Sequence, residues 1–215
     1  MAVLVLVAVP EPSRVDRADI VDRPITFDAE RARLTVEYRR IHEDPEAQGT
    51  TITPRVIVVH HTALATLAAS RRAFEPTRLP AARGELARGG AVNVSAHFLV
   101  DRDGTIYRLM PETTMARHVI GLNHVALGIE NVGGLPGTPL TPAQLEANAA
   151  LVRSLVRRHP GITHLLGHHE AARMEGHPYR RERLAGYKTV KIDPGAPFMT
   201  ALRARVDDLG LSGPP

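Results

Sequence analysis

The stretch Val56-Ile57-Val58-Val59-His60-His61-Thr62 places two histidines directly after a run of four β-branched residues. Such a run predicts a central strand that is covered on both faces. Open sheets form their sites at the carboxyl ends of strands, and neutral imidazole is the commonest metal ligand. Neighbouring strand residues point to opposite faces, so only one of His60 and His61 can face a metal. Taken alone, the doublet has a simpler interpretation, two partly buried histidines that hydrogen-bond to each other or to the backbone.

Around this strand, helices and strands alternate along the chain. Asp103-Gly104 predicts the turn of a hairpin within residues 95–110, and Thr141-Pro142-Ala143-Gln144 predicts a capping box at the start of a helix. Further strands are expected at 125–132 and 163–168, and further helices from residue 28 (with Leu34, Tyr38 and Ile41 inward), over 64–74 and over 198–209. This order predicts an α/β fold with a central mixed sheet flanked by helices; α+β with helices on a mixed sheet is the alternative.

Composition excludes several classes of protein and of site. The 215 residues are 43% hydrophobic and 23% charged, which fits one globular domain. No apolar run reaches the roughly 18 residues of a membrane span. The absence of cysteine excludes disulfides, thiolate metal sites and cysteine nucleophiles. A net charge of +4 permits an anionic partner, but 4% aromatic residues and no Trp disfavour a nucleic-acid surface, so no nucleic-acid partner is expected.

Residues 1–27 are expected to form an N-terminal arm ahead of a single domain over residues 28–215. Ala2 to Val9 is an apolar run that ends at Pro10 and has the length of the hydrophobic region of a signal peptide. No basic residue precedes the run and no small-x-small cleavage site follows it. A remnant of an export signal and an N-terminal strand are therefore both open.

Three further groups carry chemistry. The cluster His168-His169-Glu170 follows an H-x-x-x-H spacing from His164 that lacks the glutamate of the zincin motif, and Gly167 argues against a regular helix there. In Lys191-Ile192-Asp193-Pro194-Gly195, the period of two places Lys191 and Asp193 on one side of an extended segment. Glu130 ends an apolar strand, where an unpaired carboxylate is costly and suits a general base. The simpler interpretations are a polar loop, a solvated salt pair and a glutamate at the sheet edge.

In combination, these motifs are specific. A strand followed by His-His-Thr, then SAHFLVDRDGTIYR, ALGIEN, GHHE and KIDPG occur in that order. Over residues 54–206 the chain resembles the type 2 N-acetylmuramoyl-L-alanine amidases, which share a fold with the peptidoglycan recognition proteins. The resemblance implies that fold, and one Zn²⁺ per chain held by His60, His168 and Asp193.

The resemblance also bears on five other residues. Glu130 and Lys191 match the catalytic glutamate and the lysine beside the last ligand. His97 and His118 fall in segments near the substrate groove, and His61 lies in the variable place beside the first ligand. Between His168 and Asp193 lie 24 residues, more than in the shortest members, and the extra piece near 170–190 is basic. We expect it to rim the groove, with Arg180 and His61 among the substrate contacts; a basic surface loop is the alternative.

The implied reaction is hydrolysis of the amide between the lactyl group of N-acetylmuramic acid and L-alanine in peptidoglycan. Two neutral histidines and one aspartate leave a fourth tetrahedral position open, as catalytic zinc requires. A recognition module without activity, and a cytoplasmic amidase that recycles anhydromuropeptides, are the alternatives. The lead interpretation places the protein outside the cytoplasm of a bacterium. The sequence leaves the oligomeric state undetermined.

Overall fold

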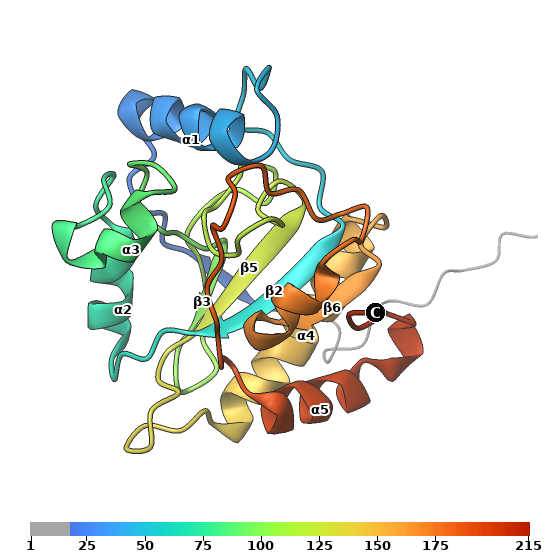
Figure 1. Ribbon diagram of the computed structural model, residues 1–215. Coiled ribbons are helices and arrows are strands. Elements are labelled where there is room, and N and C mark those ends of the chain that lie inside the picture. The colour runs from blue at the N-terminus through green and yellow to red at the C-terminus, as the bar shows by residue number, and fades with distance from the viewer. Residues whose placement is uncertain (1–17) are drawn as a thin grey trace, which may run out of the picture.

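The computed structural model describes residues 18–215, and its centre is a mixed sheet of six strands in the order β1-β4-β3-β5-β2-β6 (Figure 1). The strands are β1 (Ile20–Asp22), β2 (Val56–His61), β3 (Phe98–Val100), β4 (Ile106–Arg108), β5 (Ala126–Asn131) and β6 (His164–Gly167). All neighbouring pairs are parallel except β3 and β4, which form the hairpin predicted around Asp103-Gly104. The predicted α/β class is therefore confirmed.

Helices surround this sheet (Figure 1). They are α1 (Ala29–His42), α2 (Leu67–Phe74), the short α3 (Gly84–Ala87), α4 (Pro142–Arg158) and α5 (Ala196–Arg205), with 3-10 turns η2 (Ala81–Arg83), η3 (His168–Met174) and η4 (Asp207–Leu209). In Figure 1, α4 and α5 lie together below the sheet, α2 and α3 lie to its left, and α1 lies above it. The capping box of Thr141 and Gln144 begins α4 as predicted.

Side chains along β2 and β5 alternate between the two faces of the sheet. Both faces are packed, and one of them also carries polar groups. Ile57 and Val59 pack with side chains of α4 and α5, and Leu127 and Ile129 of β5 join the same cluster. Val56, Val58 and Ala126 pack into a second cluster, with Val119 and Met174. All of these side chains are fully or almost fully buried, and each valine, leucine, isoleucine or methionine among them contributes on the order of 1.5–3 kcal/mol to folding. His60 and Glu130 continue the second set by period two.

Two expectations from the sequence need comment. Ile41 is 40% exposed, so the prediction that it points inward is wrong; α1 buries Leu34 and Tyr38 together with polar Arg31 and His42. Within the arm, Ile20–Asp22 pairs with β4, and Ile25 is buried. The Ala2–Val9 run lies outside the described residues. Across residues 18–215, no helix has the length and apolar character to span a membrane.

Candidate metal centre and catalytic cavity

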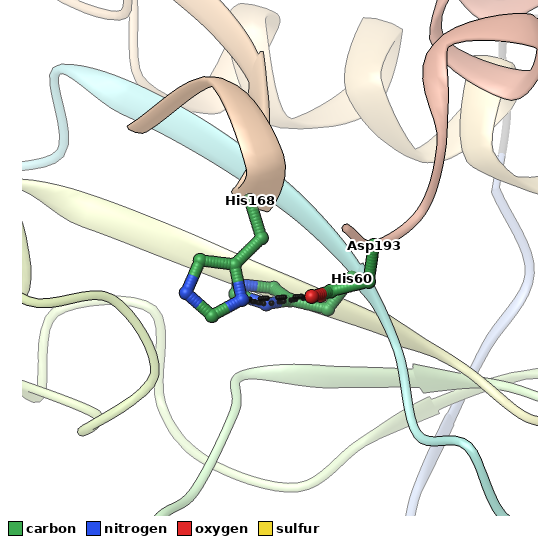
Figure 2. A group of neighbouring side chains, drawn as sticks. All are labelled: His60, His168 and Asp193. Carbon is green, nitrogen blue, oxygen red and sulfur yellow. Dashed lines mark hydrogen bonds and ion pairs between the residues drawn. The ribbon is translucent and has the colours of Figure 1, made fainter. Parts of the chain in front are cut away.

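Three side chains from distant parts of the chain meet at one point (Figure 2). Nδ1 of His60 lies 2.9 Å from Nδ1 of His168 and 3.2 Å from Oδ2 of Asp193. Nδ1 of His168 lies 3.1 Å from the same carboxylate oxygen. Among the described residues this is the one group of three or more possible ligands whose atoms lie within 4.8 Å of one another. The structure thus brings together the three predicted ligands, with His60 rather than His61 in the group.

Each of the three residues stands where a regular element begins or ends. His60 is near the carboxyl end of β2, and His168 follows β6, the strand that pairs with β2 on its other side. Asp193 precedes α5 and is joined to Pro194 by a cis peptide bond. Because β2 and β6 are parallel, their carboxyl ends lie at the same edge of the sheet, where sites of open sheets form.

His169 has a structural role that the sequence did not reveal. Its backbone N–H donates to the carbonyl of Asp193 at 2.8 Å, and its ring Nδ1 lies 3.0 Å from the same oxygen. These contacts hold the backbone of Asp193 against His169, the residue that follows His168. The available signal in the sequence was the doublet His168-His169, since one histidine of such a pair can bind a metal while the other holds a second ligand in position.

Burial and neighbouring groups adjust the ionisation of the cluster. Burial lowers the pKa of His60 to about 4, with a further contribution from His168, so its imidazole is neutral at pH 7. Burial opposes the ionisation of Asp193, but its contacts with His168 and His60 hold its pKa well below the ordinary value. The cluster therefore presents the anionic carboxylate of Asp193 beside the neutral imidazole of His60, which is the form that binds a cation.

The donor set fits a zinc ion. Two ring nitrogens 2.9 Å apart cannot both carry a proton and face each other, so at least one lone pair points into the centre. Two imidazole nitrogens and one carboxylate oxygen are a typical three-residue set for catalytic zinc, which keeps one position for water or substrate. The centre opens into a cavity of about 270 Å³, so that position is accessible.

The two predicted catalytic residues line the same cavity. Glu130 lies on β5 in register with His60, and its Oε2 is buried without a hydrogen-bond partner among the described residues. Burial, reinforced by the nearby carboxylate of Asp193, raises the pKa of Glu130 to about 8. Lys191 is half-buried, and it reaches the cavity two residues before Asp193.

The other predicted contact residues differ in their positions. His61 and His118 both line the cavity. His97 does not: its ring is fully buried, Nδ1 accepts from the N–H of Gly128 at 3.0 Å, and Nε2 donates to the carbonyl of Thr114 at 2.9 Å. The expectation that His97 contacts substrate is therefore corrected, because both of its nitrogens are committed to the backbone.

The basic insertion borders the cavity, but Arg180 lies in an adjoining hollow. Tyr187 and Thr189 line the cavity itself. Arg180 lines a neighbouring hollow of about 540 Å³ that shares His168 and Lys191 as walls. Its Nε donates to Glu175 at 2.9 Å and its Nη1 to the carbonyl of Ile120 at 3.0 Å. The role of Arg180 as a substrate contact stays a prediction.

Comparison with known sequences identifies the family. The sequence profile described as N-acetylmuramoyl-L-alanine amidase matches residues 50–196, which include all three candidate ligands, Glu130 and Lys191. The chain belongs to this family. Among curated relatives, the endolysin of Escherichia phage T7 is 33% identical over 88 residues, and the endolysin of Klebsiella phage KP32 is also 33% identical over 88 residues. Each match covers 39% of this chain and 58% of the relative, so the chain matches little more than half the length of these relatives.

Solved structures of the same kind share the fold. The N-acetylmuramoyl-L-alanine amidase endolysin LysCS from Clostridium intestinale URNW is 25% identical, with a TM-score of 0.54 over 88% of this chain and 95% of that one. A crystal structure of AmpD is 22% identical, with a TM-score of 0.55 over 90% of this chain and 97% of that one. The second likeness shows the fold alone. Both matches cover most of this chain, so the predicted amidase-like fold is confirmed.

Proposed function

We propose that this protein is a zinc-dependent N-acetylmuramoyl-L-alanine amidase. It would hydrolyse the amide between the lactyl group of N-acetylmuramic acid and the L-alanine of the stem peptide. The observation that carries the proposal is the convergence of His60, His168 and Asp193 in a cavity that also contains Glu130, within a chain of this family. A bound Zn²⁺ supplies a Lewis acid, which polarises the scissile carbonyl and makes water more acidic.

Glu130 is the residue to which we assign the proton transfer. Its unpartnered carboxylate oxygen takes a proton from the attacking water as the new carbon–oxygen bond forms. The same carboxyl then gives the proton to the departing alanine nitrogen as the carbon–nitrogen bond breaks. Without a metal, the pKa of this carboxyl is raised to about 8, so it holds a proton readily. A bound divalent cation beside it would lower that pKa and favour the carboxylate that accepts the proton.

Lys191 is the residue to which we assign the stabilisation of negative charge. It carries a cation into the cavity on the segment that also supplies Asp193. When water adds to the carbonyl, the oxygen becomes an oxyanion, and a nearby ammonium group stabilises that state more than the neutral substrate. His61, Tyr187 and Thr189 shape the remaining wall and are available to contact the muramyl peptide.

Three measurements on the purified protein test the proposal. Metal analysis should find one zinc per chain. Incubation with muramyl dipeptide should release the dipeptide and free N-acetylmuramic acid, detected by mass spectrometry, and a chelator should abolish the reaction until Zn²⁺ is restored. Tight binding of muramyl dipeptide without cleavage by the zinc-loaded protein would favour the recognition module instead.

The substrate form and the compartment are further parts of the proposal. Polymeric peptidoglycan lies outside the cytoplasmic membrane, so a preference for polymer fits an extracytoplasmic enzyme. Faster hydrolysis of soluble anhydromuropeptides than of intact sacculi would instead indicate recycling in the cytoplasm. Determination of the mature N-terminus in the native host provides an independent check, because residues 1–10 would be absent after export processing.

A further inference from the structure

His118 contacts the candidate ligand His60 on the side away from the metal centre. Nδ1 of His118 lies 2.9 Å from Nε2 of His60, and the two rings meet edge to face. Nε2 of His118 lies 3.3 Å from the carbonyl oxygen of Ala126. His118 therefore links the backbone of β5, at the carbonyl of Ala126, to the ring of His60.

The direction of these hydrogen bonds follows from the groups involved. A carbonyl oxygen only accepts, so Nε2 of His118 carries the proton and donates it to Ala126. In the neutral ring, Nδ1 of His118 is then an acceptor, and the donor must be Nε2–H of His60. A neutral His60 with its proton on Nε2 has a free lone pair on Nδ1, the atom that faces His168 and Asp193.

We propose that His118 is a positioning residue that fixes the tautomer and ring orientation of His60 for metal binding. This inference rests on the proposed function, since it concerns the same metal centre. Ligating histidines usually donate their second ring N–H to a carboxylate or carbonyl. Here an imidazole takes that place, so His118 acts through His60, a role beyond the substrate contact expected from the sequence.

The surrounding residues form a seat for this ring. A Cβ atom on Gly128 would lie only 2.8 Å from Cγ of His118 and 2.9 Å from Cδ2 and Nδ1 of the same ring. Gly128 pairs in register with Val58, two residues before His60, so the ring sits on bare backbone beside the ligand. Oδ1 of Asn123 accepts from the N–H groups of His118 and Val119, each at 2.8 Å, which fixes the backbone that carries the ring.

An isosteric pair of substitutions tests the hydrogen bond. The two side chains in His118→Leu and His118→Asn have the same shape, but only asparagine offers an acceptor near the position of Nδ1. We expect His118→Leu to weaken zinc binding by about 10–100-fold, measured by competition with a chromogenic chelator, and His118→Asn to recover most of the loss. Thermal unfolding of the metal-free proteins controls for the fold.

A second readout follows the tautomer itself. In the metal-free protein labelled with ¹⁵N-histidine, NMR should place the His60 proton on Nε2 in the wild type and in His118→Asn. In His118→Leu it should distribute over both nitrogens. Equal zinc affinities of the wild type and both variants, or an unchanged His60 tautomer in His118→Leu, would overturn the inference. Failure of the wild type to bind zinc at all would instead overturn the proposed function.

Gly128 supplies an independent variant. Gly128→Ala places a methyl group against the His118 ring, so we expect a weaker zinc affinity. In a His118→Ala background, where the ring is gone, Gly128→Ala should cause no further loss. Equal losses in both backgrounds would contradict the proposed seat.

Discussion

His60 and Glu130 are register partners on the neighbouring parallel strands β2 and β5. Paired residues of parallel strands project to the same face, so the candidate ligand and the candidate proton carrier lie side by side. Neither side chain needs a long loop to reach the other. The register of two buried strands therefore sets the distance between metal binding and proton transfer, and five predictions follow from this site and its supports.

Substitution of the two adjacent histidines separates their roles. We expect His60→Ala to abolish stoichiometric zinc binding, because it removes one of three converging ligand atoms. His61→Ala should keep one zinc per chain. Metal content after dialysis measures both. Loss of zinc in His61→Ala with retention in His60→Ala would show that the assignment of the ligand is reversed.

Glu130→Gln tests proton transfer with little change of shape. The amide cannot accept and release the proton, so turnover of muramyl dipeptide should fall by about 10²–10⁴-fold. Zinc content and the thermal unfolding temperature should stay close to those of the wild type. Wild-type turnover in this variant would exclude Glu130 from the reaction.

Lys191→Ala tests stabilisation of the oxyanion. We expect kcat to fall by about 10²–10³-fold with a small change in KM, because the interaction grows as the charge develops. Lys188→Ala is the matched control, since Lys188 is exposed and lines only the adjoining hollow. A raised KM with unchanged kcat in Lys191→Ala would assign Lys191 to binding alone.

Glu182 ties the basic insertion to α1. Both of its carboxylate oxygens lie within 2.9 Å of Nδ1 of His42, and the side chains of His42 and Glu182 are 1% and 8% exposed. Glu182→Ala leaves a buried donor without its partner, which should cost roughly 1–3 kcal/mol of unfolding free energy. Proteolysis within residues 175–190 should also accelerate.

The exposed pair of Arg33 and Glu37 provides the control for this loss. Both side chains are about half exposed, and such pairs contribute about 0–1 kcal/mol. Denaturant unfolding of Glu37→Ala should therefore lie close to the wild type. If Glu182→Ala costs no more than Glu37→Ala, the tie does not hold the insertion in place.

Glu43 gives the fold a pH dependence. Burial raises the pKa of Glu43 to about 7 against the pull of Arg39, so the folded state holds this proton more tightly than the unfolded chain. Its contribution to stability is present below pH 4.5 and is lost as the pH rises to about 7. Glu43→Gln should gain stability relative to the wild type across this window, by up to ~3 kcal/mol. A constant difference between pH 4 and pH 8 in denaturant unfolding would contradict this effect.

The sequence by itself determined the fold class, the hairpin and the capped helix α4, and the order of its motifs carries the family resemblance that implied the three converging side chains. These follow from local patterns: a β-branched run, a turn dipeptide, a capping box and motifs in a fixed order. His60, His168 and Asp193 each stand beside such a pattern, so their residue types and order were readable before any contact was known.

Only the tertiary structure decided how the histidines divide their tasks. His97, His118 and His169 are the same residue type as the ligands, but one is bonded to the backbone at both nitrogens, one donates to Ala126 and faces His60, and one holds Asp193. The role of an imidazole depends on which acceptor each nitrogen meets, and those acceptors come from strands and loops distant in the sequence. The register of β2 with β5 and β6 sets those meetings, and no local pattern encodes a register between strands separated by a long stretch of chain.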